Sequence, residues 1–207
     1  MSSPIISNNT IDGGSGTGQS CGVINDASSS TLINNIINGG KGGVVSIGVY
    51  DQGSSSPTIS HNTINGGRGT SSYAVYDSNS SSALKNNILF TTAGTNRYCF
   101  YEANSTSDPA AFNNNDLFDA TTALYYDEGT TSINTLAGIN GLPDIASVGA
   151  NVTADPLFAN RGTGDYRLQS SSPVTQAGLD LTATIPADKD GVARTVPVSI
   201  GAYEQDY

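Results

Sequence analysis

The chain has 207 residues, of which 8 are basic and 18 acidic, so its net charge is −10 at neutral pH. Such a chain lacks the basic face that nucleic acids and anionic membranes require, and we expect neither as a partner. No apolar run approaches the length of a membrane span, and Met1 is followed by repeat sequence instead of a signal peptide. We interpret Met1 as a cloning start. Abundant Ser, Thr, Asn and Gly agree with an extracellular or bacterial cell-surface protein.

A four-part motif recurs five times along the chain. Each unit contains an apolar residue, then two residues later a turn residue, then an asparagine, and it closes on a second apolar residue. The four series are Ile6, Leu32, Ile59, Leu84 and Phe112; Asn8, Asn34, His61, Asn86 and Asn114; Asn9, Asn35, Asn62, Asn87 and Asn115; and Ile11, Ile37, Ile64, Leu89 and Leu117. The asparagine steps are 26, 27, 25 and 28 residues. A period in this range predicts a solenoid whose stacked units share one core.

The apolar runs within each repeat are short and β-branched, and Gly, Ser and Asn separate them, which indicates strands and not helices. About 26 residues accommodate roughly three short strands and three turns, which is one coil of a parallel β-helix with coils about 4.8 Å apart. The sequence therefore predicts an all-β fold of at least five coils. We expect Ile59, Asn62, Ile64 and Val75 to point inside.

A second ladder has the same period. Its members are Gly22-Val23-Ile24-Asn25, Gly48-Val49-Tyr50-Asp51, Ala74-Val75-Tyr76-Asp77, Cys99-Phe100-Tyr101-Glu102 and Leu124-Tyr125-Tyr126-Asp127. Two residues after the acids come Gly53, Asn79, Asn104 and Gly129, which favour positive φ, so we place each acid at the mouth of a turn. If the valines point inward, the tyrosines form an outward aromatic stripe beside the acid column. These tyrosines either support one another, lie under the C-terminal tail or form a platform for sugar rings. The candidate ligand-binding residues here are Tyr50, Asp51, Tyr76, Asp77, Tyr101 and Glu102.

The acids in this column have three interpretations. Carboxylates about 4.8 Å apart are close to the separation of a nucleophile and an acid in glycosidases. Asp51, Asp77 and Glu102 also form a candidate site for calcium, and the sequence suggests no other cofactor. The favoured interpretation is that each acid caps its turn by accepting backbone N–H bonds, because a turn requirement repeats in every coil whereas a functional site seldom does.

Glycine-rich loops recur in the first three coils as Gly13-Gly14-Ser15-Gly16, Gly39-Gly40-Lys41-Gly42 and Gly66-Gly67-Arg68-Gly69. They match no phosphate-binding fingerprint. Lys41 and Arg68 share one loop position and are either solvated loop-tip charges or a contact for an acidic sugar.

Three further residues, one histidine and two cysteines, are expected to have no catalytic or metal-binding role. The lone His61 is expected to be an exposed turn residue. Cys21 and Cys99 lie in coils one and four, roughly 14 Å apart along the axis, which is too far for a disulfide, so we expect free thiols.

These features resemble the right-handed parallel β-helix proteins of the pectate-lyase-like superfamily. The asparagine ladder fits that group, and the C-terminal segments resemble the tails of bacterial surface and secreted β-helix proteins: Asp155-Pro156-Leu157-Phe158, Gly164-Asp165-Tyr166-Arg167-Leu168, Ser172-Pro173, Ala177-Gly178, Asp188-Lys189-Asp190-Gly191, Arg194 and Ile200-Gly201-Ala202-Tyr203-Glu204. The resemblance implies a right-handed coil. It transfers no catalytic residue, because the superfamily includes lyases, hydrolases, adhesins and scaffolds, and no lyase residue pattern is matched.

We expect one domain, with coils over residues 1–129 and last coils plus an irregular cap over 130–207, including a short helix that begins within Ser132-Ile133-Asn134-Thr135-Leu136. The expected function is a noncatalytic secreted or cell-surface scaffold or carbohydrate-binding protein; the alternative is a polysaccharide lyase or glycoside hydrolase. A polysaccharide is the expected partner. Coil one begins at Pro4 without a cap, so we expect either preceding coils in a longer parent chain or self-association through this edge.

Overall fold

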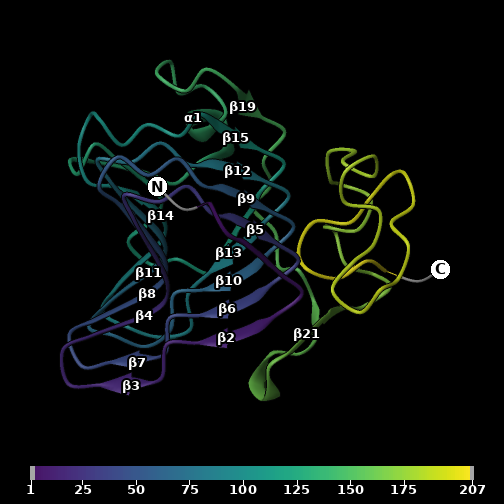
Figure 1. The fold of residues 1–207 in the computed structure, drawn as a ribbon, viewed down its shortest axis with the longest axis horizontal. Coiled ribbons are helices and arrows are strands. Elements are labelled where there is room, and N and C mark those ends of the chain that lie inside the picture. Colours follow the sequence, from purple (N-terminus) through teal and green to yellow (C-terminus); the bar gives the residue numbers. More distant parts are fainter. Residues whose placement is uncertain (1–2, 206–207) are drawn as a thin grey trace.

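The computed structural model describes residues 3–205 and shows a parallel β-solenoid of about five turns (Figure 1). This confirms the all-β solenoid predicted from the repeat. The first sheet contains β1 (Ile5–Ser7), β5 (Thr31–Ile33), β9 (Thr58–Ser60), β12 (Ala83–Lys85), β15 (Ala111–Asn113) and β19 (Val148–Gly149). The second contains β2 (Thr10–Asp12), β6 (Ile36–Asn38), β10 (Thr63–Asn65), β13 (Ile88–Phe90) and β16 (Asp116–Phe118).

The third sheet carries the second sequence ladder. It contains β4 (Gln19–Asp26), β8 (Val45–Gln52), β11 (Ser71–Ser78), β14 (Asn96–Glu102), β17 (Ala123–Asp127) and β18 (Thr131–Ile133), the last of these antiparallel. A small pair, β3 (Ser15–Gly16) with β7 (Lys41–Gly42), lies in the glycine-rich loops. The repeat thus yields three sheets because each coil supplies one strand to each.

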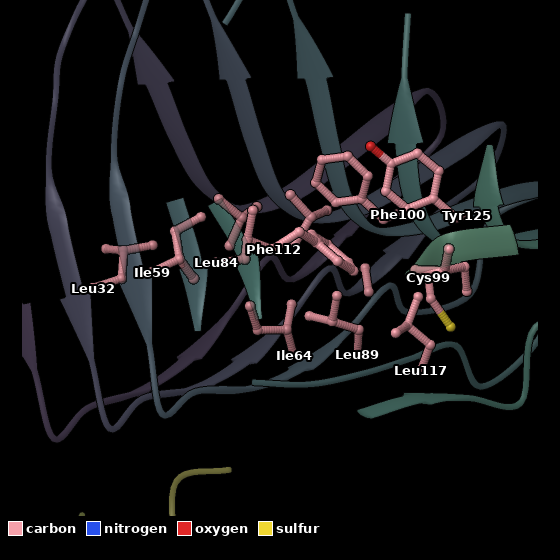
Figure 2. Packing of buried hydrophobic residues seen from close by; sticks show 14 of the residues in the cluster. Leu32, Ile59, Ile64, Leu84, Leu89, Cys99, Phe100, Phe112, Leu117 and Tyr125 are labelled. Atoms are coloured by element: carbon pink, nitrogen blue, oxygen red, sulfur yellow. The ribbon is translucent and has the colours of Figure 1, made fainter. Parts of the chain in front are cut away.

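Apolar side chains of successive coils stack in register inside the solenoid (Figure 2). Leu32 pairs with Ile59, and Ile37 pairs with Ile64. Ile59, Asn62, Ile64 and Val75 are all fully buried, as predicted. One continuous apolar column therefore runs along the axis of the solenoid, and it supplies most of the hydrophobic stabilisation.

The asparagine ladder joins adjacent coils at the turn between the first and second sheets. Asn35 donates its backbone N–H to Asn62 Oδ1 (2.8 Å), and Asn62 donates likewise to Asn87 Oδ1 (2.9 Å). The Asn62 side-chain amide also donates to the Leu32 carbonyl (2.9 Å). A sixth rung, Asn151, accepts from the Asn115 N–H although 36 residues separate the two, a step that the repeat did not predict.

The residue before each ladder asparagine has the left-handed conformation, and its side chain points away from the core. The φ angles are 61° at Asn8, 54° at Asn34, 55° at His61, 57° at Asn86 and 51° at Asn114. Three of these side chains donate to carbonyls of the C-terminal segment: Asn34 to Ala187 (2.8 Å), Asn86 to Leu179 (2.8 Å) and Asn114 to Ala177 (2.9 Å). The C-terminal segment therefore runs back along the coils.

His61 is fully buried, so its expected exposure was wrong. Its Nε2 lies 2.9 Å from the Asn86 amide nitrogen, and the C-terminal segment covers the turn column to which it belongs. Burial, followed by the charge of Arg194, lowers the pKa of His61 well below its usual value. Arg194 itself is buried, ion-pairs with Glu204 (3.1 Å) and donates to Asn34 Oδ1 (2.9 Å).

Residues after 130 close the far end of the solenoid and then cover its side. Helix α1 (Leu136–Ile139) begins at the last residue of the predicted segment, because Thr135 caps its N-terminus and strand β18 takes up residues 131–133. Ile139, Leu142 and Ile145 extend the apolar core beyond the last coil. The chain then forms β20 (Phe158–Asn160), the 3₁₀ turn η1 (Arg161–Thr163) and β21 (Asp165–Leu168).

A second apolar cluster joins the β20–β21 hairpin and the following segment to the outer face of the second sheet. It contains Ile88, Phe90, Phe158, Leu168, Val174 and Ile200. At the opposite end, β1, β2 and β4 are the edge strands of their sheets within the described residues. Self-association through this edge stays a prediction.

We predict that Asn62→Ala lowers the free energy of unfolding by about 3 kcal/mol, because the Asn35 N–H and the Leu32 carbonyl lose their buried partner. Urea unfolding measures the change. Asn9→Ala is the matched control: Asn9 is exposed and has a neighbouring ladder rung on one side only. Equal losses in both variants would contradict the role of the buried ladder.

Candidate binding surface

Six tyrosines form one surface on the outer face of the third sheet, called here the tyrosine surface: Tyr50, Tyr73, Tyr76, Tyr98, Tyr101 and Tyr126. All six side chains are half-buried. Tyr76 stacks on Tyr101 with ring centroids 4.7 Å apart, and Tyr101 stacks on Tyr126 at 4.9 Å. Tyr73 stacks on Tyr98 at 5.0 Å. The tyrosines therefore form two parallel columns that follow the solenoid axis.

A bend in each strand places both columns on the same face. Tyr73 and Tyr76 are three residues apart, yet their rings meet edge to face with centroids 5.0 Å apart. Ala74 and Val75 between them are both part of the core, so the strand does not alternate strictly there. Gly48 occupies the place of Ala74 in the previous coil, where a Cβ would lie 2.5 Å from the Ala74 carbonyl. The bend thus depends on small residues.

A shallow pocket of about 210 Å³ lies at the end of the tyrosine columns nearest the first coil. Its lining residues are Gln19, Val45, Ile47, Tyr50, Tyr73 and Tyr76. Burial, followed by neighbouring tyrosines, raises the pKa of Tyr76 to about 12, so its hydroxyl is neutral at physiological pH. The pocket therefore offers aromatic and aliphatic walls together with neutral hydrogen-bonding groups.

The acids of the ladder do not lie beside the tyrosines, contrary to the sequence-based expectation. Asp51, Asp77 and Glu102 are at most 1% exposed and point into the solenoid. The reason is the alternation of side chains along a strand: Tyr76 faces outward, so Asp77 must face inward. The expected pairing of exposed acids with an aromatic stripe was therefore wrong, although the stripe itself is present.

The buried acids bond to side chains of adjacent coils and turns. Asp51 Oδ1 accepts from the Asn25 amide (2.6 Å), and Asp77 Oδ2 accepts from the Ser82 hydroxyl (2.5 Å). Asp51 Oδ2 and Asp77 Oδ1 are buried without a hydrogen-bond partner among the described residues, and these two acids are register partners on adjacent strands. Two buried carboxyls at adjacent register positions disfavour double ionisation, and the charge of Asp51 adds to burial in raising the pKa of Asp77.

Glu102 continues this column. Its Oε1 accepts from the Tyr125 hydroxyl and its Oε2 from the backbone N–H of Glu128 (3.3 Å). The latter contact agrees with the turn-cap interpretation. Burial raises the pKa of Glu102 to about 9, that of Asp51 to about 6, and that of Asp77 well above its usual value. Buried acids whose pKa is raised and whose oxygens already accept hydrogen bonds are poor calcium ligands, and calcium binding by this column stays a prediction.

The turn residues after the acids are mostly as predicted. Gly53, Asn79 and Gly129 have φ angles of 67°, 51° and 68°. Asn104 is the exception in the described chain: its side chain accepts instead from the Thr106 N–H (3.0 Å). Tight turns therefore recur in every coil, but their geometry differs in coil four.

Lys41 and Arg68 are exposed and lie together, as their shared loop position predicts. They line a pocket that contains none of the tyrosine surface. The third cation of this pocket, Arg161, was not predicted from the repeat, because η1 lies in the aperiodic C-terminal segment.

Both cysteines are free, as expected. Cys21 is half-buried and Cys99 is buried on strands β4 and β14, which are three strands apart in the third sheet. Burial raises the pKa of both thiols.

No protein-family model, curated protein or solved structure matches this chain. In the part of the chain that the structure describes, no helix is both long enough and apolar enough to span a membrane.

The buried acids predict that stability falls as the pH rises. In the unfolded chain these carboxyls titrate near pH 4, whereas folding raises the pKa to about 6 for Asp51, 8 for Asp116 and 9 for Glu102. Their stabilising contribution is complete below the unfolded pKa and is lost as the pH rises through the folded values. For each carboxyl that is protonated in the folded state but ionised in the unfolded state, we expect the free energy of unfolding to fall by about 1.4 kcal/mol per pH unit.

Glu102→Gln isolates one of these groups, because the amide still accepts from the Tyr125 hydroxyl. Urea unfolding at pH 5, 7 and 9 should show a smaller loss of stability in the variant than in the parent chain. The exposed Asp190→Asn variant should keep the parent slope. The pKa of His61 is lowered, so its contribution to stability rises with pH below about pH 6.5. This contribution is the same in all three proteins and cancels when their slopes are compared. Identical slopes for Glu102→Gln and the parent chain would refute the burial argument.

Proposed function

We propose that this protein is a noncatalytic β-helix of the extracellular space or cell surface that binds carbohydrate through the tyrosine surface. The observation that carries the proposal is the pair of ordered tyrosine columns on a sheet face of a strongly acidic chain. The resemblance of the repeat and tail to the pectate-lyase-like group agrees with such a role.

The chemistry of the tyrosine surface suits a sugar better than a charged partner. Sugar rings have apolar C–H faces that pack on aromatic rings, and hydroxyl groups that exchange hydrogen bonds with neutral tyrosines. Tyr101 contacts Tyr73 and Tyr98 edge to face at 5.1 and 5.2 Å, in addition to its two stacked neighbours. Rings held by several neighbours lose little rotamer freedom on binding, so more of the contact energy is available for affinity.

The burial of the acid column disfavours the alternative of a glycoside hydrolase built on it. A glycosidase needs two carboxyl groups that both reach the scissile bond. Asp51 and Asp77 instead bond to Asn25 and Ser82 within the solenoid. A lyase would need a base beside a bound uronate, and the tyrosine surface contains no cation.

Substitution of a central ring tests the proposal. A glycan array and calorimetry with the best ligand should show at least a tenfold loss of affinity in Tyr101→Ala, equivalent to about 1.4 kcal/mol. Tyr101→Phe should retain most of the binding, because it keeps the stacked ring. Tyr203→Ala is the control, since Tyr203 is half-buried in the C-terminal segment away from the columns. Unaltered binding in Tyr101→Ala, or no glycan bound at all, would refute the proposal.

The enzyme alternative is tested on the same samples. We expect neither new reducing ends nor unsaturated products when the protein is incubated with acidic and neutral polysaccharides. Turnover that survives Tyr101→Ala and disappears in Lys41→Gln or Arg68→Gln would move the assignment to an enzyme whose site is the basic pocket.

A further inference from the structure

We propose that the pocket containing Lys41 and Arg68 is a binding site for a multiply charged tetrahedral oxyanion, sulfate or phosphate, either free or as a monoester. The pocket has a volume of about 270 Å³ and lies between the glycine-rich loops and the η1–β21 segment. Its charged lining residues are Lys41, Arg68 and Arg161. This site is independent of the tyrosine surface.

The stacked loops fix the spacing of the first two cations. Lys41 donates its backbone N–H to the Gly14 carbonyl (2.7 Å), and Arg68 donates to the Gly40 carbonyl (2.9 Å), which is the same contact one coil later. Gly40 and Gly67 have φ angles of 80° and 82°, and a Cβ at either position would collide with the loop of the preceding coil. The two cationic side chains are therefore carried by closely stacked backbones at equivalent positions.

The third cation comes from the far end of the sequence and is held rigidly. Arg161 donates from Nη1 to Asp119 Oδ2 (2.8 Å) and from Nη2 to the Thr91 carbonyl (2.8 Å). Its guanidinium also lies 4.8 Å from the centroid of the Phe90 ring. Its side chain remains 30% exposed, so donors are left to face the pocket. A pre-positioned arginine costs little entropy when it binds an anion.

The charge of the pocket is unusual for this chain. Three of its 8 basic residues line one pocket although the net charge is −10. Arg68 is the only arginine of the described residues without an ion pair, since the other four pair with Asp119, Asp165 or Glu204. Lys41 likewise has no acidic partner in the described part of the chain. Two carboxylates lie beside the pocket: Asp119 pairs with Arg161 and also with Arg97, and Asp12 accepts from the lining residue Asn38 (2.9 Å). Two acids against three cations leave the pocket with net positive charge.

The arrangement of the cations favours a tetrahedral oxyanion over a single carboxylate. One arginine suffices to bind a planar carboxylate through two parallel bonds. Here the cations of one pocket come from three segments, two adjacent loops and η1, so the pocket offers donors from separate backbones instead of one fork. A dianion with oxygens in several directions can accept from all three. A monoester would place its remaining group in the rest of the pocket or along its open side.

The direct test is calorimetry of the whole protein with sodium sulfate and sodium phosphate, with sodium acetate and sodium chloride at matched ionic strength. We expect saturable binding of sulfate or phosphate and none of acetate or chloride. Arg68→Gln and Lys41→Gln should each lower the affinity at least tenfold. Lys85→Gln is the matched control, because Lys85 also has no ion pair among the described residues but lies on β12, outside the pocket. Equal weak heats for all four salts, or unchanged affinity in Arg68→Gln, would overturn the proposal.

Two further measurements identify the source of the anion and separate this site from the tyrosine surface. If dextran sulfate binds more tightly than free sulfate, and free sulfate displaces it, the site is assigned to sulfate esters on a polymer. Equal affinity per sulfate group would assign the site to the free ion. Tyr101→Ala should leave binding of sulfate unchanged. The proposal for the basic pocket and the proposal for the tyrosine surface can therefore fail separately.

Discussion

The register between coils is the constraint on which the rest of the structure depends. Each buried backbone group in a turn finds its partner one coil away, and the ladder from Asn9 to Asn151 fixes that alignment by bonding an amide side chain to the next asparagine. A slip by one residue would turn every inward side chain outward. The same register that stacks Ile59 inside the solenoid stacks Tyr76 outside it. The core and the tyrosine surface therefore both depend on the register between coils.

Much of the fold could be predicted from the sequence, because the same pattern of apolar and turn residues recurs in each coil. The apolar positions, the asparagine ladder and the left-handed turn residues all follow from the 26-residue period. The C-terminal segment could not be placed, since it has no period and its hydrogen bonds span up to 181 residues, as in Lys189 with Asn8. His61 was misplaced for this reason: its turn is exposed in a bare coil and becomes buried only when the segment covers it.

The candidate site was only partly predictable. The column that contains Tyr76 and Tyr101 follows from alternation along the strands, and the same rule places Asp77 inside. Tyr73 and Tyr98 escaped notice because the bend at Ala74 interrupts the period of two. The basic pocket required Arg161, which lies beyond the repeats and reaches Lys41 and Arg68 only through the packing of Phe158 and Phe90. Local patterns thus identify ladders, whereas sites between distant segments need the tertiary fold.

The C-terminal segment also changes how such a molecule can come apart. A bare solenoid is nearly one-dimensional, so coils can open one after another from a free edge. Here Asn34, Asn86 and Asn114 bond to a single continuous segment, and Lys189 reaches back to the Asn8 carbonyl. Opening the first coils therefore strips this segment from its neighbours, while releasing the segment exposes Ile88 and Phe90. Coils that would fray independently are coupled into one cooperative unit of unfolding.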